Sequence, residues 1–290
     1  MKVLARWQRR STVEQRGSLT DDTSASDDRM SDCVRVAGLE LTLAAPSRRW
    51  HGSGPAPEAA GAGTGRHAED EMITLYGFGR IFPEGIGETK DLWVQWALEE
   101  TGLPYRVHAL DHTAGELQGD AFSRISPFHQ APVIDDEGFV VAESAAIVLY
   151  LAEKAGKLIP SDSEGRTRVA QWCFAAVSTV GTTLVCLDLV EIFGRGQAAH
   201  QIGAEVRKLA GRWLGDVERR LAEREWVACA DFTVADIMMA GVLRTIRKSD
   251  LLDPFPKLKA YYERCRARPA WQRTLGAYAA RVGVSVDDIR

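Results

Sequence analysis

The segment at residues 131–155, APVIDDEGFVVAESAAIVLYLAEKA, decides the fold. It opens with two short apolar runs that flank an acidic turn ending in Gly, at residues 135–138, a pattern typical of a β-hairpin. A helical pattern over residues 144–155 follows directly and is stopped by Gly156. The segment therefore predicts two antiparallel strands followed by a helix.

The sequence before this segment predicts two more strands and two helical stretches. Residues 73–76 have the composition of a strand, and after a glycine-rich loop residues 92–101 carry apolar side chains at helical spacing, with Gly102 as the C-cap. Residues 105–110 are rich in β-formers, and residues 114–125 predict a weaker, more polar helix or loop. The order is β-α-β-α-β-β-α, which implies a mixed four-stranded sheet with helices on its faces.

After Pro160 the strand patterns end and helical patterns take over. Helices are expected at residues 166–193 and 202–221, in a stretch opened by residues 232–237, and at residues 256–266 and 269–280. The sequence therefore predicts an α/β domain at residues 72–160 and an all-α domain at residues 161–290.

Residues 1–71 differ in composition from the rest of the chain. They are rich in Arg, Ala, Gly, Ser and Asp, and only residues 34–43 hold an apolar alternation. Such a segment buries too little apolar surface to offset the entropy lost on ordering. We expect a disordered or poorly ordered N-terminal extension.

Composition excludes several classes of protein. The 290 residues carry 36 basic and 40 acidic side chains, a net charge of −4, so the basic footprint of a nucleic-acid-binding protein is absent. The longest apolar runs are shorter than the roughly 20 residues of a membrane span, so no membrane partner is expected. Five scattered cysteines without a C-x-x-C pair fit neither a disulfide framework nor a zinc site, and a reducing cytoplasm is the expected location.

Two pairs of neighbouring residues suggest binding chemistry. A cis bond before Pro132 would leave the backbone of Ala131 free to pair with an extended peptide, although an ordinary edge-strand proline is an equal alternative. Glu143 and Ser144 stand at a helix start, where free N–H groups and the hydroxyl can hold a carboxylate and Glu143 can meet an ammonium. Taken alone, the second pair is better explained by simple helix capping.

Other motifs carry less chemistry. The Thr233–Asp236 stretch, TVAD, matches a capping box, so Asp236 is interpreted as a helix-start residue. His129 and Gln130 could reach the far carboxylate of a bound peptide, or they could be plain loop residues. No histidine pair has metal-ligand spacing, and residues 77–82 lack the third glycine of the dinucleotide fingerprint, so no metal is expected.

Five segments in this order and spacing resemble the glutathione transferase superfamily. They are ITLY at residues 73–76, VQWALEETGLPY at 94–105, SPFHQAPVI at 126–134, ESAAIVLYL at 143–151 and TVAD at 233–236. The resemblance implies a thioredoxin-like N-terminal domain that holds glutathione as co-substrate, a helical domain that lines the electrophile pocket, and a homodimer.

The resemblance also assigns roles to residues. It implies that the Ala131 backbone pairs with the cysteinyl unit of glutathione, that Pro132 carries the cis bond, and that Glu143 and Ser144 hold the γ-glutamyl head. His129 and Gln130 would lie near the glycine end.

Two residues are candidates for activating the thiol. Family members place a Tyr, Ser or Cys near the end of the first strand, but this chain has no Ser or Cys between Tyr76 and Asp91. Tyr76, at the expected end of the strand, and Thr89, at the helix start, are the two candidates, with a slight preference for Tyr76.

Three functions follow as alternatives. The first is a glutathione S-transferase that conjugates the thiol to small apolar electrophiles, as in detoxification. The others are a non-catalytic glutathione-binding or protein-interaction module, and a glutathione-dependent isomerase. Disulfide reduction through a protein thiol is disfavoured, because residues 72–160 contain no cysteine.

Overall fold

A computed structural model describes residues 72–290, except for the side chain of Glu84. The expected N-terminal extension, residues 1–71, lies outside the described residues. The first part of the described chain contains β1 (Ile73–Arg80), a 3-10 turn (Pro83–Gly85), α2 (Asp91–Thr101), β2 (Tyr105–Asp111), a 3-10 turn (Glu116–Gln118), α3 (Asp120–Ser123), β3 (Val133–Asp136), β4 (Phe139–Ala142) and α4 (Ser144–Ala155).

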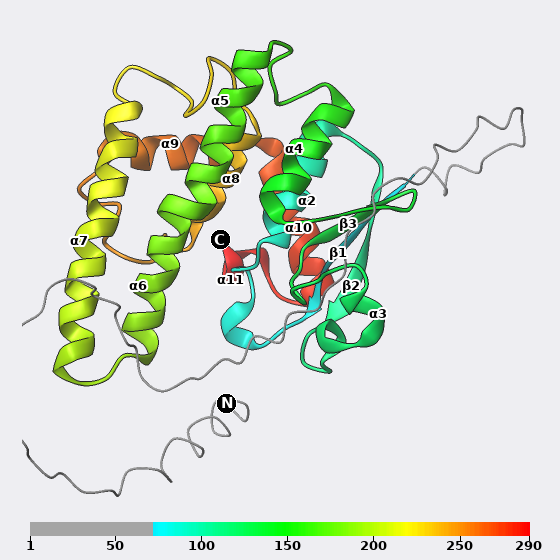
Figure 1. Cartoon of the computed structure of the whole chain (residues 1–290), viewed down its shortest axis with the longest axis horizontal. Coiled ribbons are helices and arrows are strands. Elements are labelled where there is room, and N and C mark those ends of the chain that lie inside the picture. The colour runs from blue at the N-terminus through cyan, green and yellow to red at the C-terminus, as the bar shows by residue number, and fades with distance from the viewer. Residues whose placement is uncertain (1–71) are drawn as a thin grey trace, which may run out of the picture. The chain divides into compact units, whose positions relative to one another are not determined.

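The strands form one mixed sheet in the order β2-β1-β3-β4 (Figure 1). β1 runs parallel to β2, whereas β3 is antiparallel to both β1 and β4. Tyr76 marks the register, because it stands opposite His108 on β2 and Val133 on β3. This topology confirms the predicted α/β class with its mixed four-stranded sheet.

β1 is longer than the sequence pattern predicts. It continues past Tyr76 to Arg80, and Gly77 and Phe78 pair with β2. Gly79 makes this possible, because a Cβ atom there would lie 2.6 Å from the Cβ atom of Ala109. Gly79, one of the glycines that suggested a loop, instead allows β1 and β2 to approach closely. Tyr76 therefore lies in the middle of a strand, which corrects its expected place at the strand end.

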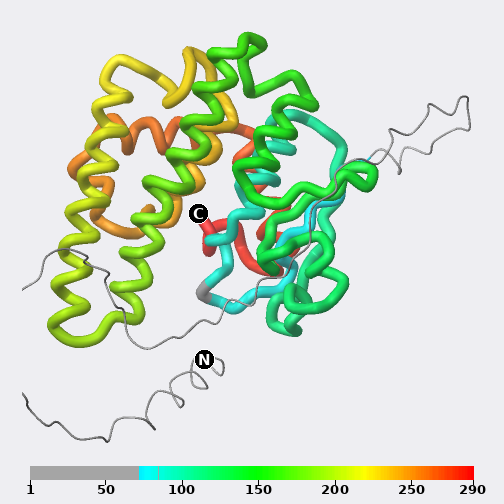
Figure 2. The backbone as a smooth tube through the Cα atoms, in the orientation of Figure 1, coloured from blue at the N-terminus to red at the C-terminus, as the bar shows by residue number. Residues whose placement is uncertain are grey.

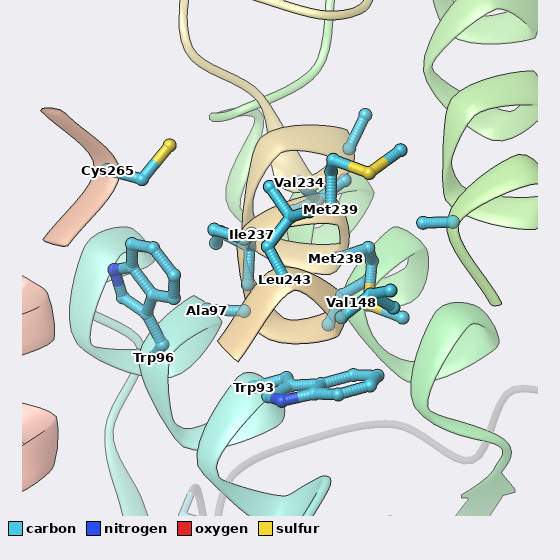
Figure 3. Packing of buried hydrophobic residues seen from close by; sticks show 14 of the residues in the cluster. Trp93, Trp96, Ala97, Val148, Val234, Ile237, Met238, Met239, Leu243 and Cys265 are labelled. Carbon is cyan, nitrogen blue, oxygen red and sulfur yellow. The ribbon is translucent and has the colours of Figure 1, made fainter. Parts of the chain in front are cut away.

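The core joins the sheet layer to the helices that follow. Trp93 and Trp96 on α2 are 4% and 1% exposed, and they pack with the apolar side chains of α8 (Val234–Arg244), as Figure 3 shows. Every residue of α8 is buried, so this helix is the centre of the helical part, as its sequence predicts.

Beyond Pro160 the described chain is helical, which confirms the second half of the predicted fold. Its elements are α5 (Ser163–Phe174), a π-helical segment (Ala175–Gly181), α6 (Thr182–Phe193), α7 (Gly196–Arg220), α8, α9 (Pro256–Arg266), α10 (Pro269–Val282) and α11 (Val286–Ile289). The capping box at Thr233 is formed, and the Asp236 carboxylate accepts from the N–H groups of Thr233 and Val227, both at 2.9 Å. Asp236 is thus a structural residue.

The continuous helical stretch Ser163–Phe193 is unusually apolar. By length and composition alone it could cross a bilayer, although its apolar residues are interrupted by polar ones and form no long unbroken run. One side of this stretch is buried in the core, with Cys173, Val180 and Leu187 among its buried residues. On its other side large apolar side chains are exposed: Phe174, Val185, Leu189, Ile192 and Phe193.

Candidate functional site

A cavity of about 310 Å³ lies where three segments meet. The segment before α2, the loop before β3 and the start of α4 form its walls. The lining residues are Phe78, Glu88, Thr89, Lys90, Ser126, Pro127, Phe128, Gln130, Ala131, Pro132, Ala142, Glu143 and Ser144. Six of the eight residues singled out from the sequence are among them.

The loop before β3 presents free backbone to the cavity. The Ala131–Pro132 peptide bond is cis, which confirms that prediction. Among residues 72–290, neither the N–H nor the C=O of Ala131 has a hydrogen-bond partner. Ser126 holds the loop in place, because its hydroxyl donates to the Gln130 carbonyl (2.8 Å) and accepts from the Gln130 N–H (2.9 Å). An extended peptide can therefore pair with Ala131 as with a strand edge.

The start of α4 forms the opposite wall. Glu143 is the N-cap residue and adopts φ 71° and ψ 115°, a sparsely populated backbone region for a residue with a side chain. Strain of this kind costs about 1–3 kcal/mol and clusters at functional sites. This backbone conformation places the exposed Glu143 and the buried Ser144 at the cavity, together with the unpaired N–H groups of the first helical turn.

A second helix start faces the same cavity. Thr89 and Lys90 immediately precede α2, and the N–H of Leu92 donates to the Thr89 carbonyl (3.3 Å). The positive dipole ends of α2 and α4 therefore both point toward this cavity, which favours an anionic ligand. Lys90 adds a positive charge, whereas the carboxylate of Glu88 is already engaged by Arg247 at 2.6 and 2.8 Å.

A buried ion pair supports the α2 wall. The Asp91 carboxylate is fully buried and accepts from Arg281 (2.8 Å) and from the Phe78 N–H (3.1 Å). Arg281 also donates to the Phe78 carbonyl (2.9 Å) and to Gln95 Oε1 (2.9 Å). Burial raises the pKa of Asp91, and the positive charge of Arg281 opposes that rise. The pair joins α10 to the end of β1 and to the first turn of α2.

Tyr76 and His129 are the two predicted residues that do not line the cavity. The Tyr76 ring packs on the sheet surface against His108 and Phe122, with centroid distances of 5.0 and 6.3 Å. The His129 ring turns away from the cavity, and its Nδ1–H donates to the Leu117 carbonyl (2.9 Å). Of the two hydroxyl candidates, only Thr89 reaches the cavity.

The sequence patterns did not point to several residues in and behind the cavity walls. Three of them, Glu88, Lys90 and Phe128, are next to predicted residues in the chain. Their position in the sequence could therefore have indicated that they line the cavity. Asp91 and Arg281 lie 190 positions apart, and no local pattern pairs them.

The described residues offer neither a metal site nor a thiol at this cavity. Within residues 72–290 no group of three His, Cys, Asp or Glu side chains could hold a metal ion. The described cysteines, all free, lie on the helices and loops after Pro160, and burial raises the pKa of Cys173 to about 12. The chemistry of the cavity thus rests on hydroxyl, carboxylate, ammonium and backbone groups.

Comparison with known families identifies this arrangement. The glutathione S-transferase N-terminal domain family matches residues 93–154, and the C-terminal domain family matches residues 195–273. A glutathione S-transferase of wheat (Triticum aestivum) is 31% identical over 195 residues, which cover 61% of this chain and 84% of the wheat protein. The chain belongs to the glutathione transferase superfamily. A disulfide-bond oxidoreductase of Escherichia coli is also similar, at 30% identity over 61% of this chain and 86% of that protein.

Solved structures of this superfamily have the same fold. A glutathione transferase from Burkholderia graminis, crystallised with two glutathione molecules per protein subunit, has a TM-score of 0.63 at 28% identity. The match covers 72% of this chain and 89% of that one. The fold and the superfamily predicted from the sequence are therefore confirmed.

Proposed function

We propose that this glutathione transferase conjugates the thiol of glutathione to small apolar electrophiles. The observation that carries the proposal is the cavity itself, which gathers the free Ala131 backbone, the α4 start at Glu143 and Ser144, and the Thr89 hydroxyl. These groups match the three parts of an extended tripeptide thiol: its backbone, its charged head and its sulfur. We also propose residues 72–160 as the glutathione-binding domain and residues 161–290 as the helical domain.

In this proposal each end of glutathione has its own contacts. The γ-glutamyl carboxylate is held by the Ser144 hydroxyl and the first N–H groups of α4, and its ammonium meets Glu143. The cysteinyl backbone pairs with Ala131 next to Pro132. Gln130 lies toward the glycine end, and His129 acts on that end only by supporting the loop.

Thr89 is the proposed activator of the thiol. A thiol with a pKa near 8.5 is only a few per cent ionised at pH 7, and lowering that pKa by about two units requires roughly 2.7 kcal/mol of thiolate stabilisation. A hydroxyl donor at the positive end of α2, with Lys90 nearby, supplies stabilisation of this kind.

The test is the pH dependence of conjugation to a generic aryl halide. In Thr89→Val the kinetic pKa of conjugation should rise by about one unit, so that the rate falls about fivefold at pH 6.5 and little at pH 9.5. Thr89→Ser keeps the hydroxyl and should retain the low kinetic pKa. An unchanged pH profile in Thr89→Val would remove Thr89 from the mechanism.

The acceptor pocket is proposed to be apolar because α6 borders this region. Burial raises the pKa of Asp188 on α6, and the negative charge of Glu88 adds to that rise. Asp188 therefore lies close enough to Glu88 for their charges to interact. The same helix exposes Val185, Leu189 and Ile192. Binding of an apolar acceptor is favoured when the acceptor removes such apolar surface from water.

Glutathione-dependent disulfide reduction is a second candidate. It is favoured by the similarity to the Escherichia coli disulfide-bond oxidoreductase and by the two glutathione molecules in the Burkholderia relative. One glutathione thiolate would attack a substrate disulfide and release one thiol. A second would attack the mixed disulfide, releasing the other thiol and glutathione disulfide. This route needs no protein cysteine, so the lack of cysteine in residues 72–160 does not oppose it.

Parallel assays separate the candidates. Turnover of the aryl halide supports conjugation, and reduction of a small-molecule disulfide supports the second candidate. Glutathione binding without either reaction would favour the non-catalytic module or the isomerase. Reduced glutathione is abundant in the cytoplasm, the location proposed for this chain.

We expect the protein to form a homodimer, as the family resemblance implies. Light scattering at micromolar concentration should give a mass near twice that of the 31.9 kDa chain. A single-chain mass under these conditions would overturn this expectation.

A further inference from the structure

An ion pair between Glu88 and Arg247 lies at the wall of the cavity that precedes α2. Glu88 lines the cavity, and Arg247 lies in the turn that follows α8. Two nitrogens of the guanidinium donate to the two carboxylate oxygens, at 2.6 and 2.8 Å. The Arg247 side chain is 6% exposed and that of Glu88 is 32% exposed. The pair therefore joins two distant segments by a two-bond contact, which is a strong geometry for an ion pair.

The guanidinium of Arg247 is held in one orientation by backbone groups. Its Nη1 atom also donates to the Arg244 carbonyl (3.0 Å), and its Nε atom donates to a backbone oxygen of Arg290 (3.2 Å). Figure 2 shows the C-terminal end of the chain beside the segment that precedes α2. Because Arg247 itself does not line the cavity, its bonds hold the Glu88 carboxylate toward the turn after α8 and away from a ligand.

We propose that Arg247 is a positioning residue that neutralises Glu88 and holds its carboxylate away from bound glutathione. The inference rests on the proposed function, which places the glutathione sulfur at this wall, and deepens it. The positive end of a helix such as α2 is equivalent to about half a unit charge, whereas a free carboxylate carries a full negative charge. An unpaired Glu88 would therefore outweigh the helix dipole, and a like charge disfavours a thiolate. Pairing with Arg247 lets the wall favour the anion.

The other charges near Glu88 do not replace this pairing. Arg244 is buried and close enough for its charge to interact with Glu88, but its guanidinium donates to two backbone carbonyls. Asp188 on α6 adds a second negative charge near Glu88. Lys90 is exposed and adds a positive charge. The further titratable groups at this wall and across the cavity are the Asp91–Arg281 pair, Tyr278 and Glu143.

The test measures the thiol pKa of bound glutathione by the ultraviolet absorbance of its thiolate. Arg247→Met should raise this pKa by about half a unit, which leaves about threefold less thiolate at a pH well below the pKa. Arg268→Met is the matched control, because Arg268 likewise makes two bonds to a glutamate, Glu100, at 2.6 and 2.9 Å, but Glu100 does not line the cavity. The control should leave the thiol pKa unchanged, and an equal rise in both variants would overturn the inference.

A second substitution separates the charge of Arg247 from its structural contacts. The double variant Arg247→Met with Glu88→Gln lacks both charges, so its thiol pKa should return to that of the wild type. The backbone contacts of Arg247 are still lost in this variant. A thiol pKa that stays as high as in Arg247→Met would mean that Arg247 acts only through the fold, and the inference would be wrong.

Glu88→Gln alone provides a test that does not require Arg247→Met to fold. This variant leaves the guanidinium without its carboxylate, so the thiol pKa should fall below that of the wild type. A rise or no change would overturn the inference while the proposed function stands. A wild type that fails to bind glutathione by calorimetry would instead overturn the proposed function itself.

Discussion

Arg281→Met is expected to destabilise the folded protein by about 3–5 kcal/mol, because it leaves the Asp91 carboxylate buried without its ion-pair partner. Arg281 is 10% exposed and Asp91 is 0% exposed, so solvent cannot replace the lost charge. Chemical denaturation at pH 7 measures the loss. Arg273→Met on the same helix is the control: its pair with Glu99 involves a half-exposed arginine and should contribute less than about 1 kcal/mol.

The pH dependence of the Arg281→Met variant provides an independent check. Burial raises the pKa of Asp91, and without Arg281 nothing of opposite charge opposes that rise. A carboxyl group whose folded pKa is raised favours the folded state when it is protonated. The variant should therefore gain stability relative to wild type as the pH falls below the raised pKa toward about 4. A constant difference between pH 8 and pH 4 would contradict the assignment.

Ser144→Ala is expected to weaken glutathione binding about tenfold or more. A hydrogen bond to a charged group contributes roughly 1.5–3 kcal/mol, and each 1.4 kcal/mol corresponds to a factor of ten in affinity. Calorimetric titration with glutathione measures the effect directly. Ser163→Ala is the matched control, because Ser163 is likewise the first residue of a helix, α5, but is exposed and does not line the cavity.

Unchanged glutathione affinity in Ser144→Ala, with the fold intact, would reduce Ser144 to a helix-start residue. Equal losses in both serine variants would indicate helix destabilisation instead of a lost ligand contact. The two variants thus distinguish binding from the capping alternative that the sequence leaves open.

Local patterns predicted most of the elements and one wall of the cavity. Gly102 stops α2 with φ 75°, and α4 and α9 begin and end where the sequence indicates. The loop at Ala131 and the helix start at Glu143 lie within one segment of the chain, so their meeting at one cavity could be anticipated. These elements and this wall could be predicted because helix propensity, capping and turn chemistry act over only a few residues of the chain.

The other wall could not be predicted in the same way. Tyr76 was a candidate because the glycines after it suggested that the strand ends there. Pairing with β2 instead extends the strand to Arg80. Because the strand continues, the Tyr76 ring lies on the sheet surface. The hydroxyl at the cavity is that of Thr89, which lies just before α2. Which hydroxyl reaches the cavity depends on strand register and on α10, and neither is encoded in the residues around Tyr76.

The cavity wall that carries Thr89 has a consequence for cooperativity. Its contacts with Tyr278, Arg281 and Arg244 span between 157 and 191 positions of the chain. Contacts that close such long loops form only when the rest of the fold has removed most of the chain entropy. Half of the binding site should therefore melt together with the whole protein. Glutathione should raise the unfolding temperature in proportion to the logarithm of its concentration, with no separate transition for the site.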